Sequence, residues 1–151
     1  MDWEGMVHAL EEIHRLLKPE GYLVDIHPFP EAPILEVYHE GRALLSEAFP
    51  SQSAEAYRQA DRAIELIVQR HLFAVEGSGA FDFFTHAPSA SALDAYWAVA
   101  SAFDQEPTDK DIQARQADLF TRVDKVVNAV GISSEVVLHE RGRITVLRSS
   151  V

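Results

Sequence analysis

The chain has 151 residues, of which 47% are hydrophobic and 25% are charged, a composition typical of one globular domain with a sizeable core. It contains no cysteine, which excludes disulfides and thiolate zinc sites. The formal net charge of -11 disfavours nucleic acid and anionic membranes as partners. Neither a membrane-spanning apolar run nor a signal peptide is visible, so we expect a cytoplasmic protein.

The first predicted elements are a helix and a strand. Residues 2–17 carry apolar side chains at three- and four-residue spacing, which predicts a helix that Pro19 and Gly21 end. Residues 22–26 are almost all apolar, Asp25 being the exception. Such a run predicts a strand that is buried on both faces, as in a parallel sheet.

A hairpin, a helix and a short strand are predicted next. Residues 34–49 contain two strand-like runs around His39-Glu40-Gly41, a turn typical of hairpins. A helix is expected over residues 53–71. Gly77 and Gly79 are expected to interrupt the chain before a short aromatic strand at residues 80–85.

Two helices and a second hairpin complete the predicted fold. Ser91 with Asp94, and Thr108 with Asp111, have the spacing of capping boxes at two helix starts, and Gly131 is expected to end the second helix. The segment 136–147 has two β-branched runs around Arg141-Gly142, which predicts the hairpin. No linker divides the chain, so we expect a single α/β or α+β domain over residues 1–151.

The order of these elements resembles the C-terminal half of class I S-adenosylmethionine-dependent methyltransferases. In that family a helix ends in a Lys-Pro-Gly-Gly-like turn before the fifth strand of a Rossmann-like sheet, and Lys18-Pro19-Glu20-Gly21 fills this place. The resemblance implies a truncated Rossmann-like sheet with residues 22–26 as the fifth strand. It also implies that the terminal hairpin supplies the sixth and seventh strands and that residues 29–107 form a lid-like insert.

The glycine-rich loop and the acidic residue that hold the cofactor in this family have no counterpart in the sequence. We therefore expect no cofactor in this chain alone, and S-adenosylmethionine only if a partner chain completes the site. The leading hypothesis is a methyltransferase-like interaction module that is not catalytic alone. One alternative is the acceptor-binding subunit of a split methyltransferase, and another is a binder of small hydrophobic ligands.

Candidate site residues are few, and no metal site is predicted. His27 ends the strand predicted at residues 22–26, where its imidazole could deprotonate an acceptor hydroxyl; the alternative is a loop histidine without chemistry. An acceptor pocket could be lined by Phe83, His86, Tyr96 and Trp97. Aromatic side chains at such spacing are more often core residues, which is the competing interpretation.

A partner is expected because the missing half of the sheet would leave the strand at residues 22–26 with an unpaired edge. We expect either a homodimer that pairs two such strands across a two-fold axis or a cofactor-binding partner chain. The alternative is that the chain covers this edge with its own hairpin at residues 34–49.

Overall fold

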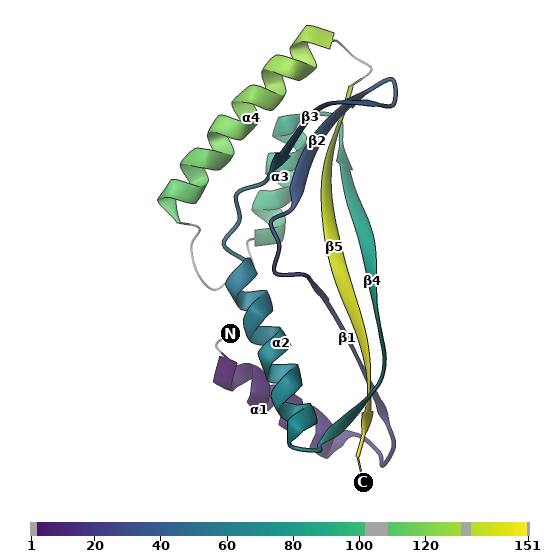
Figure 1. Ribbon diagram of the computed structural model, residues 1–151. Coiled ribbons are helices and arrows are strands. Elements are labelled where there is room, and N and C mark those ends of the chain that lie inside the picture. Colours follow the sequence, from purple (N-terminus) through teal and green to yellow (C-terminus); the bar gives the residue numbers. More distant parts are fainter. Residues whose placement is uncertain (1–2, 102–108, 131–133, 151) are drawn as a thin grey trace. The chain divides into compact units, whose positions relative to one another are not determined.

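The computed structural model describes residues 3–101, 109–130 and 134–150, which form a mixed α/β fold (Figure 1). In chain order the elements are α1 (Trp3–Leu16), β1 (Tyr22–Pro28), β2 (Ile34–His39), β3 (Arg42–Ala48), α2 (Ala54–Gln69), β4 (Phe73–Ala87), α3 (Ala90–Ser101), α4 (Lys110–Val130) and β5 (Ser134–Ser149). None of the helices in this described part is long and apolar enough to span a membrane.

The strands form one sheet in which β5 is the central strand. The strand order is β1-β5-β2-β3, and β4 pairs with the other side of β5. β1, β2 and β3 make antiparallel pairs, with Tyr22 opposite Arg148 and Ile34 opposite His139. Mixed α/β structure was therefore predicted correctly, but the parallel pairing expected of the segment at residues 22–26 is wrong.

The chain divides into two compact units. The first unit consists of Met1–Glu31, Ser53–Asp82 and Arg141–Val151, and the second unit consists of Ala32–Gln52 and Phe83–Glu140. β4 pairs with β5, and each of these strands has residues in both units. A single domain over residues 1–151, as expected from the sequence, stays a prediction.

In the first unit, α1 and α2 pack on one face of β1, β5 and the first part of β4. The fully buried side chains there are Ile67 of α2, Phe73 of β4 and Leu147 of β5. Apolar residues of α1 and β1 pack around them, among them Leu10, Ile13 and Leu23. The helical stripe predicted for residues 2–17 therefore contributes Leu10, Ile13 and Leu17 to this core.

In the second unit, α3 and α4 pack on β2, β3 and the first part of β5. The core contains Leu35 and Val37 of β2, Phe49, Leu93, Leu119, Val123, Val136 and Leu138. Glu40 and Gly41 both have positive φ values, 50° and 76°, between β2 and β3. This conformation is that of a two-residue hairpin turn, and it confirms the hairpin predicted at residues 34–49.

The chain break predicted at Gly77 and Gly79 and the hairpin turn predicted at Arg141-Gly142 are wrong, because these glycines lie inside long strands. β4 continues through Gly77 and Gly79, and β5 continues through Arg141 and Gly142. At position 142 the Phe81 ring of β4 lies on the glycine; an added Cβ would stand 2.5 Å from Phe81 Cζ, so a larger residue would require the ring to move. The predicted terminal hairpin is therefore one continuous strand.

The starts of α3 and α4 also differ from the predicted capping boxes. Ser89, not Ser91, caps α3, because its hydroxyl accepts a hydrogen bond of 3.1 Å from the Ala92 N–H. Asp109 caps α4 by accepting the Asp111 N–H at 2.8 Å. The predicted cap Thr108 and the predicted stop Gly131 lie outside the described residues.

Candidate functional site

The first candidate site is a polar cluster around His27 in the first unit. Successive side chains of a strand alternate between its faces, so Asp25 and His27 share the face of β1 that α2 covers. His27 Nδ1 is 2.7 Å from Asp25 Oδ2, and His27 Nε2 is 3.1 Å from Asp61 Oδ1 of α2. Arg143 of β5, which pairs in register with His27, donates to the same Asp61 oxygen at 2.6 Å.

The two carboxylates favour the protonated imidazolium, in which both ring nitrogens donate. The pKa of His27 is raised above its ordinary value, chiefly by the hydrogen bond to Asp25 and against the opposing effect of burial. The side chain is only 10% exposed. Since both nitrogens are engaged, this arrangement leaves none free to accept a proton from a substrate. The cluster therefore holds β1, α2 and β5 together, and a catalytic role for His27 stays a prediction.

The ring of Phe29 extends this cluster. The guanidinium carbon of Arg143 is 4.8 Å from the Phe29 ring centroid, and that of Arg141 is 5.2 Å away. Both distances are in the range of cation–π contacts. Phe29 thereby fixes the end of β1 against the middle of β5, where the Phe29 N–H also donates to the Arg141 carbonyl at 2.9 Å.

The predicted acceptor-pocket residues lie in the second unit, apart in sequence from the His27 cluster. The Trp97 ring packs edge-on against Phe49, with the centroids 5.2 Å apart, as part of the core. Tyr96, its neighbour on α3, is 53% exposed. His86 Nδ1 is 2.8 Å from Glu135 Oε1 on the surface, and Phe83 is half-buried in β4. Core packing of Trp97 is what the competing interpretation expected.

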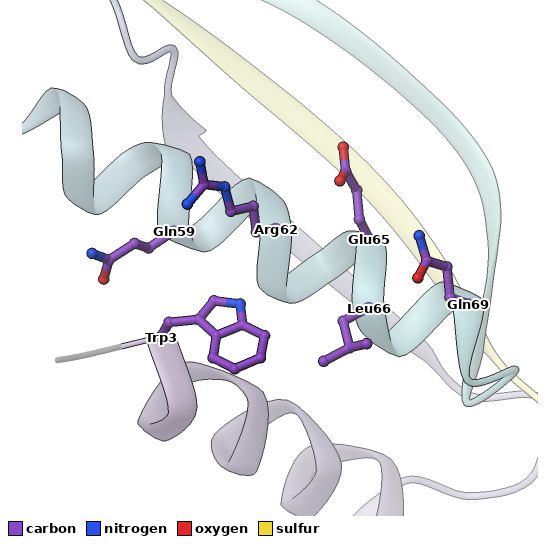
Figure 2. A pocket seen from close by; sticks show the side chains of 6 residues that line it. All are labelled: Trp3, Gln59, Arg62, Glu65, Leu66 and Gln69. Carbon is purple, nitrogen blue, oxygen red and sulfur yellow. The ribbon is translucent and has the colours of Figure 1, made fainter.

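A groove between α1 and α2 of the first unit has a volume of about 530 Å³ (Figure 2). It is lined by Trp3, Gln59, Arg62, Glu65, Leu66 and Gln69. Figure 2 shows the indole of Trp3 and the side chain of Leu66 between the two helices. Sequence reasoning placed Trp3 on the helical stripe but missed this groove. The lining residues at positions 59, 62, 66 and 69 are three or four positions apart, and this spacing could have indicated that they share one face of the helix.

A further feature is an apolar face on β1, the strand for which the sequence predicted an unpaired edge. Tyr22, Val24 and Ile26 are 59%, 51% and 60% exposed, whereas the intervening residues point toward the helices. Their register partners on β5 are Arg148, Val146 and Ile144, so the apolar face continues onto the next strand. Exposed apolar side chains at alternate positions of an edge strand are typical of a binding surface.

No family model, curated protein or solved structure matches this chain. Within the described ranges, no group of three or more His, Asp and Glu side chains is arranged to hold a metal ion. The apolar edge of β1 and the groove between α1 and α2 both lie in the first unit.

Proposed function

We propose that this chain is a binding module that recognises another polypeptide by strand addition at β1, and that it does not transfer methyl groups alone. The observation that supports the proposal is the free, apolar edge of β1. Among the described strands β1 pairs with β5 alone, and the predicted cover is absent because the hairpin β2–β3 pairs with β5 instead.

The direction of the backbone groups supports strand addition. The Ser149 N–H donates to the Gly21 carbonyl at 2.8 Å, and the Phe29 N–H donates to the Arg141 carbonyl at 2.9 Å. In an antiparallel pair, every second residue of a strand exchanges backbone hydrogen bonds with the neighbouring strand. Gly21 and Phe29 do so with β5, so the N–H and C=O groups of the odd-numbered residues of β1 point toward β5. The N–H and C=O groups of Tyr22, Val24 and Ile26 therefore point away from β5, toward the free edge.

Edge strands with unpaired backbone groups bind other strands, and alternate side chains then give specificity. In β1 the residues with outward-pointing backbone groups are also those with exposed apolar side chains. A partner strand would gain hydrogen bonds and apolar contacts from the same residues. The interaction module predicted from the sequence is consistent with this edge.

The split methyltransferase receives less support from the fold. β1 pairs with residues 142–148, which the resemblance assigns to the seventh strand of the family. However, β5 is one strand where the resemblance implies a hairpin. We therefore retain the binding module without a catalytic role as the proposed function.

A designed strand peptide with alternating apolar and polar residues tests the proposal. Titration into isotope-labelled protein is expected to shift the amide resonances of Tyr22, Val24 and Ile26 and to slow their hydrogen exchange. A peptide with the same composition but its apolar residues in one block is the control. Unchanged resonances at these three amides up to millimolar peptide, in protein that is monomeric by sedimentation equilibrium, would contradict strand addition.

The groove between α1 and α2 supports a second candidate function, the binding of a small ligand with an apolar body. Its volume of about 530 Å³ lies within the range of small-molecule sites, and Trp3 and Leu66 offer apolar surface beside polar side chains. In a Trp97→Phe variant, Trp3 is the only tryptophan. Saturable quenching of its fluorescence by a hydrophobic probe such as anilinonaphthalene sulfonate, lost in Leu66→Glu, would support this candidate.

A further inference from the structure

We infer that the strand which β1 receives is β1 of a second copy of this chain, in a two-fold symmetric dimer whose axis passes through Val24. This inference rests on the proposed strand addition and names its partner. The supporting observation is that two antiparallel copies of β1 are complementary, in backbone hydrogen bonds and in side chains, in one register.

Only a restricted set of registers allows two antiparallel β1 strands to exchange hydrogen bonds. The outward-pointing backbone groups belong to Tyr22, Val24 and Ile26, so an even-numbered residue must lie opposite an even-numbered residue of the partner. In the symmetric register that places Val24 opposite the partner's Val24, Tyr22 lies opposite the partner's Ile26. Every outward N–H of these three residues then meets a carbonyl group.

The neighbouring registers are less favourable. Shifting the pair so that Asp25 lies opposite the partner's Asp25 brings two carboxylates together and places Tyr22 opposite the partner's Pro28, which has no N–H. Shifting it the other way places Ile26 opposite Glu20 of the partner. Glu20 has a φ value of 60° and lies outside the strand. The register centred on Val24 keeps Tyr22, Val24 and Ile26 clear of both problems, because Pro28 and Glu20 then lie opposite each other beyond these three residues.

The side chains also match in the register centred on Val24. On the exposed face, the aromatic Tyr22 lies beside the β-branched Ile26 of the partner, and the two Val24 side chains lie beside each other. Such cross-strand pairs are among the favourable ones in antiparallel sheets. Because only three residues of each copy make the contact, the interface is small and we expect a weak, reversible dimer. The net charge of -11 on each copy opposes association, so added salt should strengthen it.

Single cysteines test the register directly, since the natural chain has none. In Val24→Cys the two Cα atoms would be about 5.5 Å apart across the axis, within the range that a disulfide spans. In Tyr22→Cys or Ile26→Cys alone, the equivalent residues would be about 13 Å apart at roughly 3.3 Å per residue. We therefore expect oxidative cross-linking in Val24→Cys and in a mixture of the Tyr22→Cys and Ile26→Cys proteins, but not in either of these alone.

Val75 provides a matched control, because it is as exposed as Val24 at 51% and lies on β4 of the same unit. Val24→Lys should convert the dimer seen by sedimentation equilibrium into a monomer, and Val75→Lys should leave the dimer unchanged. A dimer that persists in Val24→Lys, or a chain that stays monomeric up to about 200 μM in high salt, would overturn the inference.

The same proteins distinguish failure of the dimer from failure of the proposed function. A monomeric chain whose Tyr22, Val24 and Ile26 amides still respond to the designed strand peptide overturns the dimer and leaves strand addition intact. A monomeric chain without that response overturns both.

Discussion

The ring of Phe81 on β4 lies against the backbone of Gly142 on β5, so that a Cβ atom at position 142 would stand 2.5 Å from Phe81 Cζ and 2.9 Å from both Cε atoms. The ring shields the glycine in the middle of a strand from water, since Gly142 is buried although Phe81 is 39% exposed. This contact joins the two longest strands of the fold.

Replacement of this glycine should destabilise the protein through the ring. Gly142→Ala is expected to lower the free energy of unfolding by about 1–2 kcal/mol, because the Phe81 ring must move away. In a Phe81→Ala background the same change should cost less, which a double-mutant cycle from urea unfolding would measure. Gly77→Ala is the control, since no atom lies within 4 Å of the added Cβ. Equal costs at positions 77 and 142 would contradict the explanation.

The His27 cluster should make stability depend on pH. Its folded-state pKa lies above the ordinary value of about 6.5, so the stabilisation is fully present below that pH and is lost as the pH rises through the folded pKa. Urea unfolding at several pH values between about 5.5 and 8.5 should show this decline.

Two variants identify the source of that pH dependence. His27→Gln should flatten the profile, and Asp61→Asn should reduce its slope because one of the two carboxylates is removed. An unchanged slope in His27→Gln would assign the effect to other groups.

Adjacent aromatic residues on α3 should differ in their effects on stability. Trp97→Ala is expected to cost about 2–3 kcal/mol, because it removes a partly buried ring packed on Phe49. Tyr96→Ala should change stability by less than about 0.5 kcal/mol, since Tyr96 is 53% exposed. Thermal unfolding measures both. A larger cost for Tyr96 than for Trp97 would contradict the core assignment.

The chain alone should have no measurable affinity for S-adenosylmethionine. The sequence has no strand followed by a glycine-rich loop, which is the loop that approaches the cofactor in this family. The His27 side chain on one face of β1 is already hydrogen-bonded to Asp25 and Asp61. Calorimetric titration at millimolar cofactor is the measurement. Saturable binding of one cofactor per chain would refute the binding-module proposal and restore the methyltransferase hypothesis.

Elements with a strong local pattern were predictable from the sequence. The stripe at residues 2–17 became α1, the segment 53–71 became α2, and the turn at Glu40-Gly41 became the hairpin between β2 and β3. Each depends on residues close in sequence. The errors at Gly77, Gly79 and Gly142 have another origin. There a glycine, usually a turn residue, is held in a strand by pairing with a distant strand.

The candidate sites were only partly predictable for the same reason. His27 stands out in the sequence as a strand-end histidine, but Asp61 and Arg143, which complete its cluster, lie 34 and 116 residues farther along the chain. The unpaired edge at residues 22–26 was expected, but which of its side chains are exposed was not predictable, because an apolar run contains no sign of which face the helices cover. Only the placement of α1 and α2 on the opposite face makes these side chains an open surface.

The central position of β5 has a consequence for biosynthesis. This strand lies between β1 and β4 in the first unit and between β2 and β4 in the second, yet it is translated after every other described element. While the nascent chain grows, α1, α2 and the β2–β3 hairpin can form locally, but neither unit can close its sheet. Folding must therefore wait until the β5 residues leave the ribosome, and until then the free edges of β1, β2 and β4 are all accessible to chaperones and to neighbouring nascent chains.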